Sequence, residues 1–172
     1  DIGASYYKFN LAPEKLEEAL PYFADKNFAG LNLTVPHKVE VLSRKLVEVS
    51  ADTLWQMGAA NTLKWEGSRY VAYNTDGYGL SRAIGEAFFP GQPLPLRDVS
   101  VVLLGAGGAA RAAGFQALRE RCRELWIGNR NPQRLQDLIR QLNHPRAVSF
   151  DLADPPGFMP RDPVLINATS LG

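Results

Sequence analysis

Apolar residues in the first half of the chain switch between a helical and a strand period. Behind Pro13, which suits the first turn of a helix, Leu16, Ala19, Leu20 and Phe23 recur at helical spacing. The same reasoning predicts, in chain order, strands over 5–9 and 30–35, a helix over 39–49, a hairpin of strands 62–65 and 70–73, and a helix over 76–89. This half therefore mixes short strands with helices.

The second half of the chain alternates more strictly between strand and helix. A Pro/Gly-rich stretch from Pro90 to about Pro95 predicts a boundary between two domains, 1–95 and 96–172. Beyond it the pattern predicts a buried strand over 99–104, a helix over 109–121, a strand over 125–127, a helix over 132–142 and a strand over 164–166. This is the rhythm of a doubly wound sheet, so the predicted fold class is α/β with a Rossmann-like second domain.

A glycine-rich loop follows the strongest predicted strand and opens a helix. Its residues are Gly105, Ala106, Gly107, Gly108, Ala109 and Ala110, which fit the pattern G-x-G-x-x-[G/A]. Gly105 permits a tight turn, Gly107 leaves room for a pyrophosphate, and Ala110 allows close packing of helix on strand. The N–H groups at a helix start bind anions. We interpret the loop as a dinucleotide site; the alternative is a merely structural glycine-rich turn.

The end of the next strand indicates which dinucleotide binds. NAD sites usually carry an acidic residue about 20 positions after the loop, on the ribose 2′-hydroxyl. Here Asn129, Arg130 and Arg134 occupy that region and no acid is present. Two arginines four residues apart suit the charge-assisted bonds that grip a 2′-phosphate. This favours NADP; the alternative is that both arginines are solvated surface residues.

Three polar motifs lie at predicted strand ends and turns of the first half. They are Asn32-Leu33-Thr34-Val35-Pro36-His37-Lys38, Gly58-Ala59-Ala60-Asn61-Thr62-Leu63 and Asn74-Thr75-Asp76-Gly77-Tyr78-Gly79. Amide, hydroxyl, ammonium and carboxylate groups gathered at strand ends are typical of a cleft for a polyhydroxylated ligand. Taken singly, each motif is equally well explained by turn chemistry or by a helix N-cap.

Taken together, the motifs resemble those of one family. Asn-x-Thr-x-Pro-x-Lys, Gly-Ala-x-Asn-Thr, Asn-Thr-Asp-Gly, Gly-Ala-Gly-Gly-Ala, Asn-Arg-x-x-x-Arg and Asn-Ala-Thr-Ser-x-Gly occur in this order in shikimate dehydrogenases, and the resemblance runs from about Tyr6 to Gly172. It implies an N-terminal substrate domain, a Rossmann-like NADP-binding domain and an active site between them. The implied activity is the NADP-dependent, reversible reduction of 3-dehydroshikimate to shikimate, a step of aromatic amino acid biosynthesis.

The resemblance also implies roles for individual residues. Lys38 matches the family's catalytic lysine and Asp76 its partner carboxylate. The positions implied in substrate binding are Asn32, Thr34, Lys38, Asn61 and Asp76, and those implied in cofactor binding are residues 105–109, Asn129, Arg130, Arg134, Thr169 and Ser170. Burial lowers the pKa of an ammonium group, whereas a neighbouring carboxylate raises it. The sequence therefore leaves open which of Lys38 and Asp76 moves the proton.

The chain also departs from the family pattern. A Ser-x-Ser segment for the substrate carboxylate has no match before Tyr6, and a later Tyr and Gln of the family have none after Gly172. If 172 residues were the whole protein, we would expect weak or absent turnover and exposed sheet edges. Alternatives to a shikimate dehydrogenase are a quinate or related cyclitol-acid dehydrogenase, and a non-catalytic nucleotide-binding relative or inactive fragment. Methylene-tetrahydrofolate dehydrogenases are disfavoured by the Asn-Thr-Asp-Gly run.

From composition and charge we do not expect several classes of function. A net charge of +1 gives no electrostatic reason to expect nucleic acid or an anionic membrane as a partner. No run approaches the roughly 18 apolar residues that cross a bilayer, and no secretory signal is visible. With one cysteine, Cys122, and two scattered histidines, His37 and His144, we expect no metal site.

The remaining choices concern single side chains. We interpret Cys122 as a half-buried apolar residue rather than a reactive thiol, although nearby arginines would favour a thiolate. We interpret His37 as a packing or rim residue rather than a general base. The expected partner is a small-molecule substrate, the expected compartment is the cytoplasm, and the sequence leaves the oligomeric state open.

Overall fold

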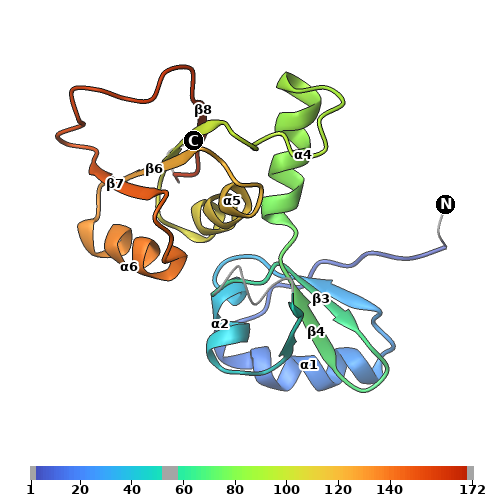
Figure 1. The fold of residues 1–172 in the computed structure, drawn as a ribbon. Helices are drawn as coiled ribbons and strands as arrows, with labels where there is room; N and C mark the ends of the chain where they lie inside the picture. Colours follow the sequence, from blue (N-terminus) through green and yellow to red (C-terminus); the bar gives the residue numbers. More distant parts are fainter. Residues whose placement is uncertain (1–2, 52–57, 170–172) are drawn as a thin grey trace.

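The computed structural model describes residues 3–51 and 58–169, and it contains two separate four-stranded sheets. The first sheet has the order β1-β3-β4-β2, built from β1 (Gly30–Asn32), β2 (Glu48–Val49), β3 (Thr62–Trp65) and β4 (Tyr70–Tyr73). β3 pairs antiparallel with both β1 and β4, whereas β2 runs parallel to β4. This sheet packs with η1 (Pro13–Lys15), α1 (Leu16–Asp25) and α2 (His37–Ser43), as Figure 1 shows in its lower half.

The core of this first part forms where the apolar stripe of α1 meets the sheet. Leu16, Leu20 and Phe23, spaced at helical intervals, are each at most 7% exposed. They pack in one cluster with Val41 of α2 and Leu63 of β3. The predicted hairpin of β3 and β4 is confirmed at both strands.

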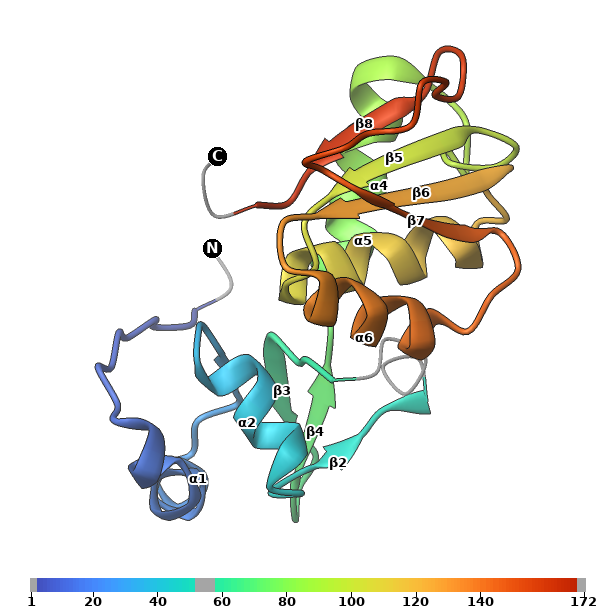
Figure 2. The same cartoon turned by 90° about the vertical axis from the view of Figure 1, so that its left-hand side faces the viewer.

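The second sheet is parallel throughout, with the order β7-β6-β5-β8. Its strands are β5 (Ser100–Leu104), β6 (Glu124–Asn129), β7 (Ala147–Asp151) and β8 (Val164–Asn167), and its helices are α5 (Gly108–Arg119) and α6 (Pro132–Leu142). In chain order this arrangement is 3-2-1-4, the first part of the Rossmann order. Figure 2 shows the four strands as one layer over α5 and α6. The predicted Rossmann-like fold of this part is therefore confirmed.

Helix α4 (Asp76–Phe88) leads from β4 of the first sheet to the second part of the molecule, where it lies beside α5 (Figure 1). Its residue Ile84 and the following Leu96 belong to the core of the second sheet. The buried carboxylate of Glu120 connects these elements: it accepts hydrogen bonds from the Ser81 hydroxyl, from the Leu96 N–H (2.9 Å) and from Gln116 Nε2 (2.7 Å). The predicted boundary near Pro95 stays a prediction.

Three predicted elements differ from the structure by more than two residues, and one strand was missed. Residues 5–9 are extended but belong to no strand among the described residues, and the ring of Phe9 packs instead on Phe23 and Phe28, with centroids 4.9 and 5.7 Å apart. The strand predicted over 30–35 ends at Asn32, ahead of Pro36. The helix predicted over 39–49 ends at Ser43, because the chain then turns into β2. The edge strand β7 was not predicted, since Phe150 is its only buried residue and gives no alternation.

Candidate active site

Lys38 and Asp76 form the central contact of the candidate site. Lys38 Nζ donates to Asp76 Oδ2 at 2.7 Å, with 26% and 32% of the two side chains exposed. Lys38 lies in the first turn of α2, and Asp76 is the first residue of α4. Asn74 fixes that helix start, because its Oδ1 accepts the Asp76 N–H at 3.0 Å while its Nδ2 donates to the Ala59 carbonyl at 2.9 Å. The fold thus joins two charges that are 38 residues apart.

Asn61 holds the carboxylate from its other side. Asn61 Nδ2 donates to Asp76 Oδ1 at 2.6 Å and to Thr75 Oγ1 at 2.9 Å. Asn61 Oδ1 accepts the Thr75 N–H at 3.0 Å and the Thr62 hydroxyl at 3.0 Å. Both amide protons and both lone pairs of the oxygen are therefore engaged. Asp76 is held between an ammonium and an amide, with its orientation fixed.

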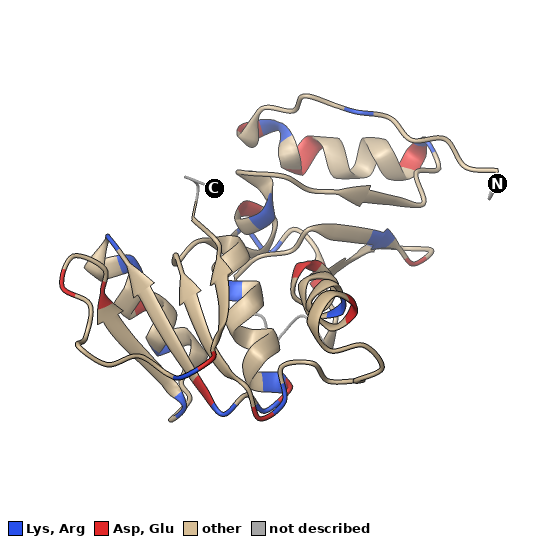
Figure 3. Ribbon diagram, turned by 90° about the horizontal axis from the view of Figure 1, so that it is seen from above, with Lys and Arg blue, Asp and Glu red and all other residues tan. Residues whose placement is uncertain are grey.

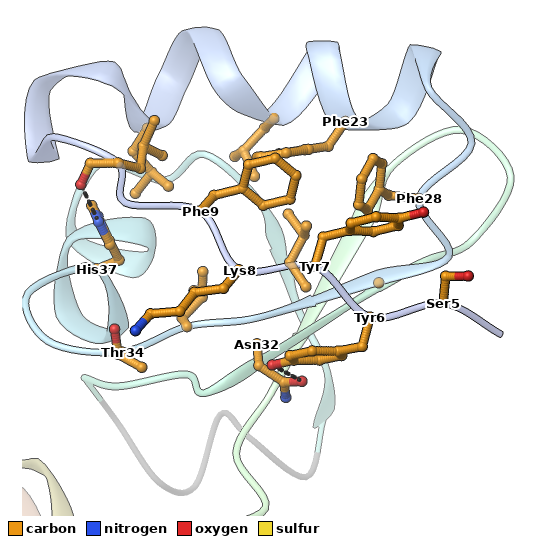
Figure 4. A pocket seen from close by; sticks show the side chains of 16 residues that line it. Ser5, Tyr6, Tyr7, Lys8, Phe9, Phe23, Phe28, Asn32, Thr34 and His37 are labelled. Carbon is orange, nitrogen blue, oxygen red and sulfur yellow. Dashed lines mark hydrogen bonds between the residues drawn. The ribbon is translucent and has the colours of Figure 1, made fainter.

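Asn32 and Thr34 lie at the edge of a groove rather than against Asp76. The groove has a volume of about 320 Å³ and runs between the N-terminal segment 5–9 and β1 (Figure 4). Asn32 Oδ1 accepts the Tyr6 hydroxyl at 3.3 Å, and its Nδ2 donates to Thr62 Oγ1 at 3.4 Å. The side chain of Thr34 lies at the same end of the groove as that of Lys8. The aromatic rings of Phe9, Phe23 and Phe28 line the other wall.

His37 is a packing residue in this structure. It is 9% exposed, and its Nε2 donates to the Leu11 carbonyl at 2.9 Å, which ties α2 to the N-terminal segment (Figure 4). The expectation that it serves packing rather than general base chemistry agrees with this contact. His144 accepts the Arg146 N–H through Nδ1 at 3.2 Å.

The glycine loop turns from β5 into α5 as its sequence predicts. Gly105 has φ +114°, and a Cβ there would lie 2.8 Å from the Ala168 carbonyl oxygen, so a larger residue does not fit beside the end of β8. Ala110, in the first turn of α5, is fully buried. Gly107 is the N-cap of α5, and a Cβ on it would meet no atom within 4 Å. The start of α5 thus has the open approach that a pyrophosphate group needs.

The predicted 2′-phosphate residues lie at the same end of the sheet. The Gly105 N–H donates to the Gly128 carbonyl at 2.8 Å, so the loop after β6 is next to the glycine loop. Asn129 Nδ2 donates to the Asn131 carbonyl at 2.9 Å, and Asn131 caps α6 by accepting the Arg134 N–H at 3.0 Å. Arg130 and Arg134 are exposed there. Their roles in cofactor binding stay predictions.

The end of β8 completes this side of the site. The Ala168 N–H donates to the Leu104 carbonyl at 2.8 Å, which fixes the loop beside β5. Thr169 donates to Asn167 Oδ1 through its N–H at 3.1 Å and through its hydroxyl at 2.8 Å. Ser170, predicted beside the nicotinamide, lies outside the described residues.

Cys122 is fully buried, which corrects the expectation of a half-buried residue. Burial raises the pKa of its thiol to about 11, against the smaller opposite effect of Arg146. A reactive thiolate at neutral pH is thereby disfavoured. Within the described ranges, no group of three or more His, Cys, Asp or Glu side chains could hold a metal ion, and no helix is long and apolar enough to cross a membrane.

Sequence reasoning missed two residues of the site. Thr62 and Thr75 each hydrogen bond to the Asn61 amide, although neither was singled out. Both lie within recognised motifs, directly after Asn61 and directly before Asp76. Their position gave a signal, but only the three-dimensional structure shows which way their hydroxyl groups point.

Comparison with known proteins finds one matching family model and several similar proteins. Residues 1–63 match the family described as shikimate dehydrogenase substrate binding domain. Over 171 residues the chain is 35% identical to the NADP+-dependent shikimate dehydrogenase of Ignicoccus hospitalis, an alignment that covers 99% of this chain and 60% of that protein. Over nearly its whole length, the chain is similar to shikimate dehydrogenases. It spans about 60% of the length of the first curated relatives that it matches.

Solved structures of shikimate dehydrogenases have the same fold. One in complex with NADP+ is 30% identical, with a TM-score of 0.76 over 95% of this chain and 55% of that chain. A quinate dehydrogenase from Corynebacterium glutamicum in complex with NAD is also similar, at 27% identity and a TM-score of 0.69 over 90% of this chain and 54% of that chain. The predicted resemblance to the shikimate and quinate dehydrogenases is therefore confirmed.

Proposed function

We propose that this chain carries the catalytic pair and the nucleotide loop of an NADP-dependent shikimate dehydrogenase, which reversibly reduces 3-dehydroshikimate to shikimate. The 2.7 Å contact between Lys38 Nζ and Asp76 Oδ2 carries the proposal. It joins two of the motifs that resemble those of the family. Helix α4, which begins at Asp76, packs on α5, which begins at the glycine loop. The pair and the loop therefore belong to connected elements.

The reaction needs a group that takes the proton of a substrate hydroxyl. When shikimate is oxidised, the C–H bond of the alcohol carbon breaks, its electron pair leaves as hydride, and the O–H proton leaves to a base. Bound NADP supplies the hydride acceptor at C4 of its nicotinamide. Lys38 Nζ and Asp76 Oδ2 are 2.7 Å apart and both side chains are partly exposed, so the pair can take the hydroxyl proton and pass it to water.

The residues after β5 and β6 fit the phosphate groups of NADP. The open N-terminus of α5 at Gly107 suits the pyrophosphate. Arg130 and Arg134 are exposed cations at the same sheet end and suit a 2′-phosphate. These contacts, a cytoplasmic location and a small molecule as the substrate are parts of the proposal.

Purified protein tests the proposal with two substrates and two cofactors. We expect shikimate with NADP+ to give growth of the reduced-nicotinamide absorbance, and NAD+ to support it poorly. NADP+ binding measured by calorimetry separates binding from turnover. Binding with no turnover of either shikimate or quinate would contradict the dehydrogenase proposal and favour a nucleotide-binding relative.

A quinate dehydrogenase is the second candidate. The similarity to the quinate dehydrogenase of Corynebacterium glutamicum supports it. Turnover of quinate without turnover of shikimate would select it. That enzyme was crystallised with NAD, whereas the two arginines after β6 of this chain favour NADP, so the cofactor assay separates the candidates further.

A further inference from the structure

Thr62 lies between the two asparagines of the candidate site. It is the first residue of β3 and pairs directly with Asn32 of β1 in the antiparallel register. Its hydroxyl donates to Asn61 Oδ1 at 3.0 Å and accepts from Asn32 Nδ2 at 3.4 Å. One side chain thus contacts both the groove and the group that holds Asp76. Packing alone explains why a threonine is found in a strand. It does not explain the two hydrogen bonds of the Thr62 hydroxyl.

The direction of each hydrogen bond follows from the fixed donors. The backbone N–H of Thr75 can only donate, so Asn61 presents Oδ1 to it and Nδ2 to the Asp76 carboxylate. The single hydroxyl proton of Thr62 is then committed to Asn61 Oδ1, and its lone pairs remain for Asn32. Asn32 consequently turns Nδ2 toward Thr62 and leaves Oδ1 facing the groove.

The position of Asn32 Oδ1 has a chemical consequence. In the structure it accepts the hydroxyl of Tyr6 at 3.3 Å, within the groove of Figure 4. A carbonyl oxygen held this way recognises a hydroxyl group and rejects a second acceptor such as a ketone or a carboxylate. The bonds from Asn32 through Thr62 and Asn61 to Asp76 also share one direction, and such chains strengthen one another.

We propose that Thr62 is a positioning residue that fixes both amides: it orients Asn61 against Asp76 and presents Asn32 Oδ1 as the acceptor of a substrate hydroxyl. The inference rests on the proposed dehydrogenase function. It assigns Thr62 no contact with the reacting atoms; Thr62 acts through the two asparagines.

Two variants separate the hydroxyl from the shape of the side chain. Thr62→Val keeps the β-branch and removes the hydroxyl, whereas Thr62→Ser keeps the hydroxyl. Ser149→Ala is the control, because Ser149 is an exposed hydroxyl residue on β7, outside the site. For Thr62→Val we expect kcat/KM for shikimate to fall roughly 5- to 30-fold, the range for a lost hydrogen bond that supports a charged group. The KM for NADP+ should change less than about twofold. In Thr62→Ser and Ser149→Ala, kcat/KM for shikimate should stay near the value of the parent protein.

A second readout does not depend on turnover. Hydrogen exchange of the Asn61 side-chain amide, followed by NMR, should speed up in Thr62→Val and stay slow in Thr62→Ser and Ser149→Ala. If the parent protein oxidises neither shikimate nor quinate, the proposed function fails and this exchange measurement alone decides the role of Thr62. Unchanged Asn61 exchange in Thr62→Val overturns the inference, as does equal damage from Thr62→Ser and Thr62→Val, because then the methyl group rather than the hydroxyl matters.

Discussion

Gly77 lies directly against the backbone of Ala112, so close that a Cβ at Gly77 would be 2.7 Å from the Ala112 carbonyl oxygen. This contact joins the first turn of α4, where Asp76 lies, to the second turn of α5, which follows the glycine loop. The distance between the proposed proton-transfer pair and the proposed nucleotide loop is therefore set by a residue that lacks a side chain.

Gly77→Ala should push α4 away from α5, because the obstacle is backbone and cannot rotate aside. We expect a loss of about 1–3 kcal/mol in the free energy of unfolding from overpacking, partly offset by the roughly 1 kcal/mol that alanine gains over glycine inside a helix. The kcat for shikimate oxidation should also fall, and by more than the fraction of protein that this loss of stability unfolds. Gly79→Ala in the same helix meets no atom within 4 Å and serves as the control, which should be neutral or stabilising. Urea unfolding of both variants measures this, and equal effects would show that the close approach is unimportant.

Glu120 is expected to contribute to stability rather than to chemistry. Glu120→Ala leaves the Leu96 N–H and the Gln116 amide without their buried acceptor, and we expect a loss of at least about 3 kcal/mol in the free energy of unfolding. Glu86→Ala is the control, since Glu86 is 76% exposed and its ion pair with Arg82 is worth little. Thermal unfolding compares the two, and a Glu120→Ala protein as stable as Glu86→Ala would rule out the proposed connection between α4 and α5.

Cys122 should resist thiol reagents in the folded protein. Because burial raises its pKa to about 11 from an ordinary value of 9.0, the thiolate is scarce near pH 8 and the sulfur is inaccessible. Because the pKa of the Cys122 thiol is higher in the folded protein, keeping this thiol protonated stabilises the fold. That contribution is complete below pH 9 and is lost as the pH rises toward 11. Labelling with a chromogenic disulfide at pH 8 should be slow until denaturant is added. Fast labelling without denaturant would contradict the burial.

Arg130→Ala should weaken use of NADP and spare NAD. Loss of a charge-assisted bond to the 2′-phosphate is expected to raise the KM for NADP about tenfold, while the KM for NAD, which lacks that phosphate, stays near its parent value. Arg140→Ala removes the same charge from the exposed side of α6 and is the control, because its side chain is 70% exposed and pairs with Asp137. An unchanged KM for NADP in Arg130→Ala would remove the basis for the cofactor preference.

The sequence predicted those elements whose apolar positions repeat regularly. Helix α6 and the hairpin of β3 and β4 were predicted at their observed bounds, because capping residues and turn glycines mark their ends. The segment 5–9 and the strand β7 were misjudged, because at an edge the neighbouring chain rather than the local pattern decides pairing. Within the site, the motifs singled out Lys38, Asp76 and Asn61. They did not reveal that Thr62 and Thr75 fix the Asn61 amide, since hydroxyl direction depends on contacts across the sheet.

Lys38→Ala is the most direct test of the central claim, that Lys38 and Asp76 together take the substrate proton. We expect Lys38→Ala to lower kcat for shikimate oxidation by at least about 100-fold, the usual contribution of a positioned general base, while the dissociation constant of NADP+ measured by calorimetry stays within about twofold. Equal losses in turnover and in NADP+ binding, or a kcat like that of the parent protein, would contradict the claim.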